Sequence, residues 1–161
     1  MTDQNMLFAR EDEIASALFD TTPEVLTDKY LIFESDDLLF GAHADHVSEI
    51  ITNISVTHLP MVPHYVCGII NLRGQIVPIL DLRLLLGKAP GEKYATVVLN
   101  IDGTQIGVLV DRVDQMIDLP KSSILPVPRQ NAQRLISGMC TLPGGIGTMM
   151  VLDCPLLLHE S

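Results

Sequence analysis

From residue 30 onward the sequence is a succession of short apolar runs separated by polar or turn-forming residues. These runs occupy residues 30–33, 38–42, 47–51, 66–70, 76–80, 94–101, 105–110, 116–119, 135–140 and 148–152. Runs of about four to eight residues bounded by Asp, Gly and Pro are typical of β-strands joined by tight turns. A parallel α/β sheet would need helical patterns of about 10–15 residues between its strands, and the sequence lacks them. The chain is therefore predicted to be all-β.

The dipeptide Asp102-Gly103 is the clearest hairpin signal in the chain. It separates two apolar runs, and Asp-Gly in this position favours a two-residue type I′ turn. In the run that follows, every second residue is Ile or Val, which fits a strand with one face directed toward a core.

Two small β-barrels that share a core, with only short helices, are the predicted architecture. About ten short strands are too many for one barrel in a chain of this length. Brief helical stretches are predicted at 43–46, 82–86 and 155–159. The stretch 81–93 contains both Gly and Pro and is the predicted link between the two barrels.

Residues 1–28 have a different pattern from the rest of the chain. Leu7, Ile14 and Leu18 recur at helical spacing, and Pro23 ends the pattern. Such an amphipathic helix would either pack on the domain or act as a docking arm, and the sequence leaves both roles open. The predicted division is an acidic arm over 1–28 and a β domain over 29–161.

The charge of the chain is concentrated in its first third. Residues 1–50 hold twelve Asp or Glu and two Lys or Arg, whereas residues 51–161 hold eight of each. Nucleic-acid binding needs clustered Lys and Arg, so the pattern excludes it. An acidic surface serves solubility or a basic protein partner. Direct membrane insertion is not expected, because no apolar run approaches the ~20 residues of a membrane span, and a secretory signal is also lacking.

The residues that could carry chemistry do not form a recognisable constellation. His43 and His46 flank Asp45, but a zinc site needs at least about three ligands, and solvated or hydrogen-bonded histidines are the simpler interpretation. The glycines of 143–147 are not followed by Lys-Ser/Thr, so they predict a hairpin loop rather than a phosphate-binding loop. The widely spaced cysteines indicate reduced cytosolic thiols: Cys67, Cys140 and Cys154. We expect no enzyme, metal or cofactor.

The most informative segment contains the turn 71–74 (Asn-Leu-Arg-Gly), which lies between two apolar runs. Arg73 is the only Asp, Glu, Lys or Arg between Glu49 and Asp81. Gly74 suits a position with positive φ. An arginine this isolated is either exposed at the tip of a turn or paired with a carboxylate, which its planar fork favours.

Residues 68–82 resemble the hallmark of the CheW family, Gly-x-x-Asn-Leu-Arg-Gly-x-Ile-x-Pro-Ile-x-Asp-Leu. Residues 40–50 are similar to the strand, short turn and Val-x-Glu-Ile strand of the family's first barrel. Residues 107–113 are similar to its Gly-x-x-Val-Asp-x-Val strand in the second barrel. The three motifs occur in the family's order and span about residues 29–158, which makes the resemblance specific.

The resemblance implies two five-stranded SH3-like barrels around a shared core and a non-catalytic adaptor role. Its implied partners are the cytoplasmic tip of a chemoreceptor, which is a helical coiled coil, and the regulatory domain of a CheA-type histidine kinase. The implied location is cytoplasmic, at membrane-associated receptor arrays.

The resemblance also implies where a receptor would bind. The family's groove between the barrels falls on four apolar residues: Leu31, Ala42, Val47 and Val113. By sequence alone, Leu31 and Val47 would serve equally well in the core. Ala42 is smaller than the aliphatic residues usual at its position.

The implied charged pair is Glu49 and Arg73, expected to form a salt bridge that fixes the hallmark turn beside the partner-binding face. Plain solvent exposure of both side chains is the alternative. The hallmark turn itself comprises Asn71, Leu72 and Gly74.

Three departures from the family pattern leave the partner set open: the long acidic arm, the polar turn at 43–46 and the short C-terminal helix. The alternative function is a CheW-like paralogue that serves a non-flagellar array, such as one for pilus motility, or competes with the main adaptor.

Overall fold

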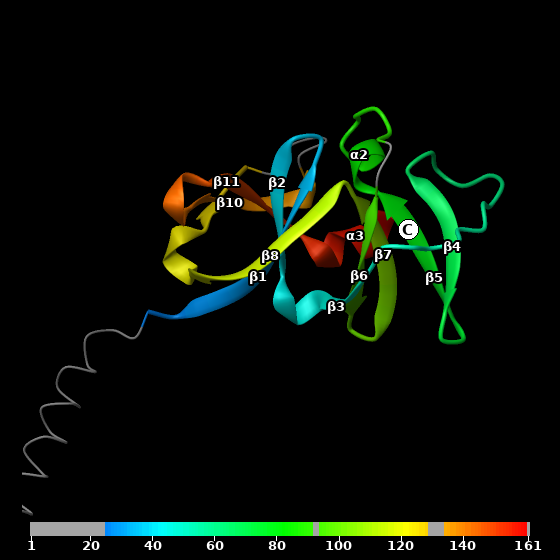
Figure 1. The fold of residues 1–161 in the computed structure, drawn as a ribbon, viewed down its shortest axis with the longest axis horizontal. Coiled ribbons are helices and arrows are strands. Elements are labelled where there is room, and N and C mark those ends of the chain that lie inside the picture. Colours follow the sequence, from blue (N-terminus) through cyan, green and yellow to red (C-terminus); the bar gives the residue numbers. More distant parts are fainter. Residues whose placement is uncertain (1–24, 92–93, 129–133, 161) are drawn as a thin grey trace, which may run out of the picture.

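The computed structural model describes residues 25–91, 94–128 and 134–160, whose strands form two sheets (Figure 1). One sheet contains β1 (Thr27–Ser35), β2 (Leu38–His43), β8 (Arg112–Pro120), β9 (Leu125–Pro126), β10 (Ile136–Leu142) and β11 (Gly147–Leu152). The other contains β3 (Val47–Ile51), β4 (Val66–Leu72), β5 (Gln75–Asp81), β6 (Ala95–Ile101) and β7 (Thr104–Val110). The short helices are η1 (Ala44–His46), α2 (Leu82–Leu85), η2 (Lys121–Ser123), η4 (Pro143–Gly145) and α3 (Cys154–Glu160).

The six-stranded sheet has the strand order β8-β1-β2-β11-β10-β9, and the five-stranded sheet has the order β3-β6-β7-β5-β4. The pairs β2–β11 and β5–β7 are parallel, and the other named pairs are antiparallel. The predicted all-β class is confirmed, and each predicted apolar run lies largely within a strand. The predicted brief helices correspond to η1, α2 and α3. Strand β9 was not predicted, because its two residues are too few to form a pattern.

The path of the chain corrects the predicted link between the two β units. The chain enters the five-stranded sheet through η1 and leaves it at Asp111, between β7 and β8. The stretch 81–93 instead leads from β5 to β6, which both belong to the five-stranded sheet. Because β7 lies between β5 and β6, this connection must pass over a strand, and its Gly and Pro residues serve that crossing rather than a domain boundary.

The start of the β domain also differs slightly from the prediction. Thr27 and Asp28, assigned by sequence to the arm, belong to β1 and pair with Pro120 and Leu119. Polar residues at the start of an apolar strand gave no sequence signal for this pairing. The helix predicted within the arm lies outside the described residues.

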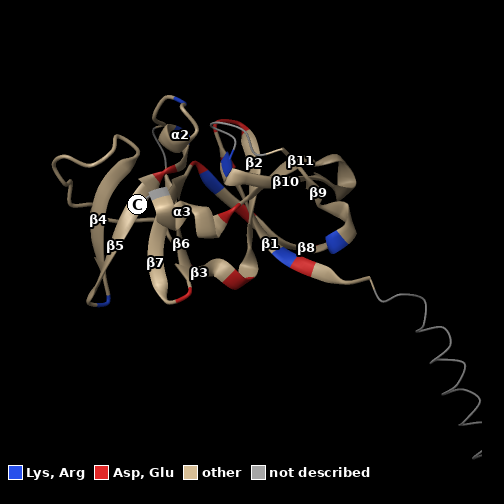
Figure 2. Cartoon of the chain, turned by 180° about the vertical axis from the view of Figure 1, so that it is seen from behind, with Lys and Arg blue, Asp and Glu red and all other residues tan. Residues whose placement is uncertain are grey.

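Three hairpins have two-residue turns whose central residues both have positive φ. These are Asp36-Asp37 (53° and 61°), Arg73-Gly74 (51° and 86°) and Asp102-Gly103 (52° and 88°). Positive φ at both central positions defines the type I′ turn, whose twist matches that of the flanking strands. The turns of β4–β5 and β6–β7 lie at the same end of the five-stranded sheet and carry opposite charges (Figure 2).

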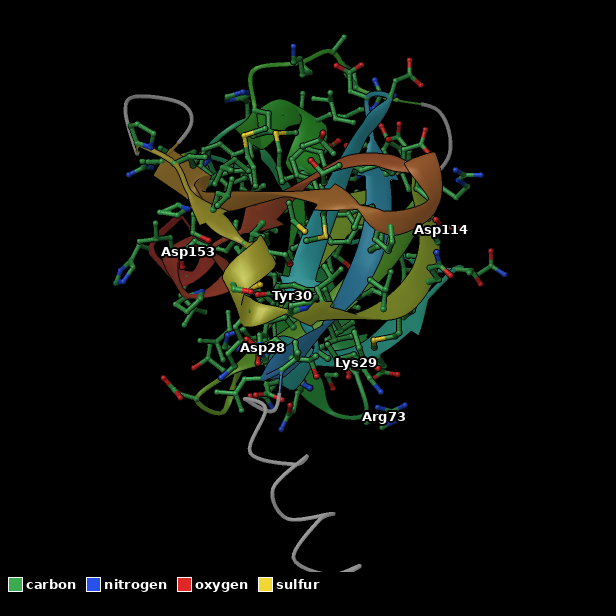
Figure 3. All side chains as sticks on the ribbon, turned by 90° about the vertical axis from the view of Figure 1, so that its left-hand side faces the viewer. Asp28, Lys29, Tyr30, Arg73, Asp114 and Asp153 are labelled. Atoms are coloured by element: carbon green, nitrogen blue, oxygen red, sulfur yellow. The ribbon has the colours of Figure 1, made fainter. Side chains whose placement is uncertain are left out.

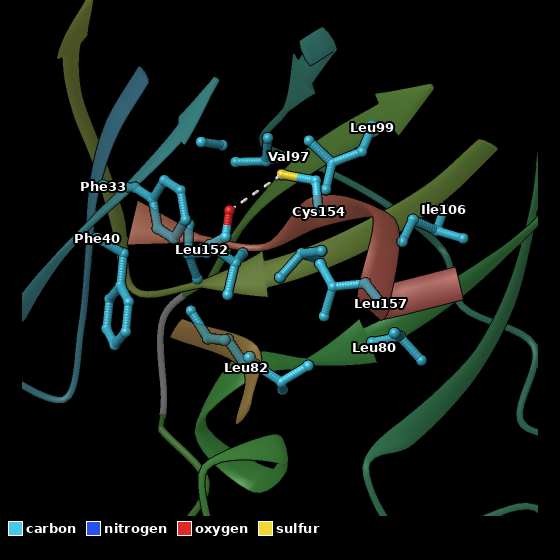
Figure 4. Packing of buried hydrophobic residues seen from close by; sticks show 14 of the residues in the cluster. Phe33, Phe40, Leu80, Leu82, Val97, Leu99, Ile106, Leu152, Cys154 and Leu157 are labelled. Atoms are coloured by element: carbon cyan, nitrogen blue, oxygen red, sulfur yellow. Dashed lines mark hydrogen bonds between the residues drawn. The ribbon is translucent and has the colours of Figure 1, made fainter. Parts of the chain in front are cut away.

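The largest core cluster contains buried side chains from both sheets and from α3, which lies between them (Figures 1 and 4). Phe33 and Phe40 come from the six-stranded sheet, Leu80 and Leu99 from the five-stranded sheet, and Leu157 from α3. Since both sheets bury apolar faces in one cluster, the described residues form one cooperative unit rather than two independent ones.

The segment after β3 returns to the far edge of the five-stranded sheet. Thr57 exchanges two backbone hydrogen bonds with Ile69 of β4, at 2.8 and 2.9 Å. Gly68 permits this approach, because a Cβ atom built there would lie 2.1 Å from the carbonyl oxygen of Thr57. A glycine in the hallmark stretch thus has a packing role as well as a conformational one.

Candidate partner-binding surface

The side chains of Arg73 and Glu49 form a bidentate ion pair. Arg73 donates from Nη1 to Glu49 Oε1 at 2.6 Å and from Nη2 to Glu49 Oε2 at 3.0 Å. Glu49 belongs to β3, at one edge of the five-stranded sheet, and Arg73 to the turn between β4 and β5 at the other edge. The pair therefore joins the two edges of this sheet through side chains. It adds to the backbone hydrogen bonds by which Thr57, in the segment after β3, pairs with Ile69 of β4.

The local sequence explains why Arg73 is presented in this way. Asn71 accepts a hydrogen bond from the Gly74 backbone N–H at 2.9 Å, which holds the turn from within. Leu72 packs against the small core cluster beneath β4 and β5. With its two neighbours fixed, the side chain of Arg73 projects from the end of the hairpin (Figure 3).

The ion pair is on the surface. The Arg73 side chain is 75% exposed and that of Glu49 is 24% exposed. Hydrogen bonds from Arg73 lower the pKa of the Glu49 carboxyl below its ordinary value. Solvent screening keeps the contribution of such a pair to stability small. An exposed fork held in one geometry is better suited to organising a contact surface than to stabilising the fold.

The four apolar residues expected at a groove differ in accessibility. Leu31 and Ala42 are buried in the large core cluster, while Val47 and Val113 are half-buried and pack against its edge. Val47 immediately follows η1, and Val113 lies two residues after Asp111, where the chain leaves the five-stranded sheet. Of these four residues, Val47 and Val113 are therefore the ones partly exposed to solvent, each next to a point where the chain passes between the sheets.

An ionic cluster at this boundary was missed by sequence reasoning. Arg83, Asp36 and Asp111 belong to segments far apart in the sequence yet contact one another. The sequence signal was an Arg directly after the hallmark Asp-Leu and an Asp within the Val-Asp-x-Val motif. Opposite charges in two separate motifs identify a pair only once the topology is known.

The histidine and cysteine side chains that could carry chemistry are hydrogen-bonded or partly buried in the fold. His43 accepts a hydrogen bond from the Asp45 backbone N–H at 3.2 Å, and its Nε2 lies 3.2 Å from Asp28. Among the described residues, no group of three or more His, Cys, Asp or Glu could hold a metal ion. Burial raises the pKa of the Cys67 thiol to about 11, so it is almost entirely protonated near neutral pH.

None of the helices that the structure describes is long and apolar enough to cross a bilayer.

Two β-sheets pack around one core, with half-buried valines where the chain passes between the sheets and an exposed ion pair within the five-stranded sheet. The protein is therefore an all-β domain built from two sheets. The model of the CheW-like domain matches residues 29–161, so the chain belongs to the CheW family.

Named relatives agree with this assignment. The chain is 32% identical over 132 residues to the chemotaxis protein CheW of Klebsiella aerogenes, covering 80% of this chain and 79% of that protein. It is 32% identical over 126 residues to the chemotaxis protein CheW of Helicobacter pylori, covering 76% and 75%. The crystal structure of the scaffolding protein TtCheW from Thermoanaerobacter tengcongensis superposes with a TM-score of 0.72 at 26% identity, covering 79% of this chain and 89% of that one.

Proposed function

We propose that this protein is a non-catalytic adaptor that couples the cytoplasmic tip of a chemoreceptor to a CheA-type histidine kinase. Membership of the CheW family supports a chemotaxis scaffold in general. The observation that carries the specific role is the Glu49–Arg73 pair, an exposed, bidentate fork on the family's hallmark turn. A fork of this kind gives geometric specificity to a contact surface.

The receptor-binding surface in this proposal is centred on Val47 and Val113. A receptor coiled coil presents an apolar stripe, which docks by the helix-in-groove mode. Val47 and Val113 offer half-exposed apolar contacts, and the buried Leu31 and Ala42 shape the surface from beneath. A few anchors of this kind carry most of the binding free energy in protein interfaces.

The kinase-binding surface in this proposal includes the hallmark turn 71–74, with Arg73 held by Glu49 beside it. The regulatory domain of the kinase is the proposed partner. The adaptor would act in the cytoplasm, at receptor arrays, and would need neither a cofactor nor nucleic acid.

Reconstitution of receptor, kinase and this protein tests the proposal directly. Kinase autophosphorylation should rise when wild-type protein is added to receptor-containing membranes and kinase. Protein carrying Val47→Asp should fail to activate, and Ile146→Asp is the matched control. Ile146 is 44% exposed and lies between β10 and β11, away from the proposed surface.

Binding without activation would contradict the adaptor role. If the protein binds receptor but lowers activation by a second CheW, it is a competing paralogue. If it binds neither receptor nor kinase, both versions of the proposal are wrong.

A further inference from the structure

Arg83 contacts segments of both sheets, and its side chain is only 19% exposed. It belongs to α2, which directly follows β5 of the five-stranded sheet. Its Nε donates to Asp111 Oδ1 at 2.8 Å, and its Nη2 donates to Asp111 Oδ2 at 2.5 Å. Asp111 is the residue at which the chain leaves the five-stranded sheet for β8 of the other sheet.

The same guanidinium reaches the six-stranded sheet. Nη1 of Arg83 donates to Asp36 Oδ1 at 3.3 Å, in the turn between β1 and β2. The backbone N–H of Asp36 donates to Asp111 Oδ2 at 3.0 Å, and that of Asp111 donates to the Glu34 carbonyl at 2.9 Å. We call the group formed by Arg83, Asp36 and Asp111 the Arg83 cluster. This cluster links α2, the β1–β2 turn and the β7–β8 crossing.

The backbone of Arg83 is also fixed by hydrogen bonds. The backbone N–H of Arg83 donates to Asp81 Oδ1 at 2.9 Å, and its carbonyl accepts from Lys88 at 2.8 Å. Gly91 lies against the guanidinium, since a Cβ atom there would be 2.9 Å from Nε. Hydrogen bonds from Arg83 also lower the pKa of the Asp111 carboxyl, so the pair is ionised at neutral pH.

The core between the sheets sets their relative angle only through the close packing of its apolar side chains. Apolar burial is itself non-directional and adds no orientation-specific bond. Charge-assisted bidentate hydrogen bonds are directional, and they are stronger where exposure to water is low. The Arg83 cluster supplies such bonds at the boundary between the sheets.

We propose that Arg83 is a positioning residue that sets the orientation of the two sheets by holding the β1–β2 turn and the β7–β8 crossing against α2. This goes beyond the proposed function, because the orientation is a property of the protein alone. Arg73 forms a comparable fork, but its partner Glu49 lies in the same sheet. The two arginines therefore form a matched pair, with one acting between sheets and one within a sheet.

Distance measurement between spin labels tests the proposal. Labels would be attached at Thr104→Cys in the five-stranded sheet and Thr148→Cys in the six-stranded sheet, two exposed positions, in a Cys67→Ser background. Double electron–electron resonance should give one narrow distance distribution for this parent protein. Arg83→Met should broaden or shift the distribution, whereas Arg73→Met should leave it unchanged. An unchanged distribution in folded Arg83→Met would overturn the proposal.

A conservative substitution separates the fork from the charge. Arg83→Lys keeps the positive charge but cannot make two parallel hydrogen bonds. The broadening should therefore persist in Arg83→Lys. Full recovery of the parent distribution would show that charge alone is sufficient and would contradict the role of the fork.

Hydrogen exchange at two backbone amides gives a second readout. The Asp36 amide donates to the side chain of Asp111, and the Gly74 amide donates in the same way to Asn71. Arg83→Met should accelerate exchange at Asp36 by about tenfold or more, with Gly74 unchanged. If Arg83→Met does not fold, Gly91→Ala decides, because its added methyl displaces the guanidinium while keeping every charge. Unchanged exchange at Asp36 in Gly91→Ala would then overturn the proposal.

Discussion

Arg73 donates hydrogen bonds to both carboxylate oxygens of Glu49, and these two residues come from opposite edges of the five-stranded sheet. The hallmark turn is thereby tied to β3, two residues beyond Val47. The pair connects the two parts of the proposed partner-binding surface.

The first prediction is that Glu49 and Arg73 are energetically coupled in partner binding. Glu49→Gln and Arg73→Met should each weaken binding of the kinase regulatory domain, and the double variant should lose less than the sum of the two. Binding would be measured by calorimetry in a double-mutant cycle. The coupling should shrink at high salt, since Arg73 is mostly exposed. Additive effects of the two substitutions would show that the pair does not act as a unit in the interface.

The second prediction concerns the half-buried valines. Val47→Asp or Val113→Asp should weaken receptor binding by more than about 2 kcal/mol, roughly thirtyfold, because a desolvated carboxylate would face the receptor's apolar stripe. The fold should survive, since both side chains lie at the edge of the core. Pull-down with receptor tips, alongside the unfolding midpoint, measures both effects. Wild-type receptor affinity in both variants would disprove the assignment of the surface.

Substitution of a buried residue beneath this surface should reduce the stability of the fold. Leu31→Ala should lower the free energy of unfolding by about 2–5 kcal/mol, as for other buried leucines. A large loss of receptor binding in Leu31→Ala at unchanged stability would mean that a receptor reaches this side chain directly.

The sequence was sufficient for the strands because their signals are local. Alternating apolar residues and dipeptides such as Asp102-Gly103 act over a few residues, and these strands formed where they were predicted. The link at 81–93 was wrong for a non-local reason. Gly and Pro mark an irregular connection, but which sheet each flanking strand joins depends on the parallel pairing of β5 with β7.

In the candidate site, too, local sequence patterns predicted some features, whereas others depend on the topology. The hallmark turn was readable from its Asn-Leu-Arg-Gly pattern, and Glu49 was identified as its partner only through the family resemblance. The contacts of Arg83 with Asp36 and Asp111 span 47 and 28 residues of sequence. Pairs this distant are fixed by topology, which periodicity does not reveal. The burial of Leu31 and Ala42 likewise depends on which face of each strand meets the shared core.

A third prediction follows from the approach of Thr57 to β4. Gly68→Ala should lower the free energy of unfolding by about 2–4 kcal/mol, because its Cβ would overlap the Thr57 carbonyl and Gly68 has a φ of +146°. Gly103→Ala is the control, with φ of +88° and open space around the added methyl, and it should cost only about 1 kcal/mol. Urea unfolding of the two variants compares these losses. Equal losses would mean that backbone strain alone, and not the close contact, explains the glycine.

The last prediction is a pH dependence with opposite signs at two neighbouring carboxyls. Hydrogen bonds from Arg83 lower the pKa of Asp111, so its contribution to stability is present above the ordinary Asp pKa of about 4 and is lost as the pH falls through the lower folded value. Burial raises the pKa of Asp81, so its contribution is present at low pH and is lost as the pH rises through the raised value.

Substitution by asparagine separates the two carboxyls. The stability that wild type holds over Asp111→Asn should be largest near neutral pH and shrink as the pH falls below about 4, whereas the difference from Asp81→Asn should change in the opposite direction. Urea unfolding between about pH 3 and pH 7 measures both trends. A difference for Asp111→Asn that stays constant with pH would show that this carboxyl has the same pKa in the folded and unfolded protein. The hydrogen bonds from Arg83 would then give the ionised Asp111 carboxylate no net stabilisation over its unfolded state.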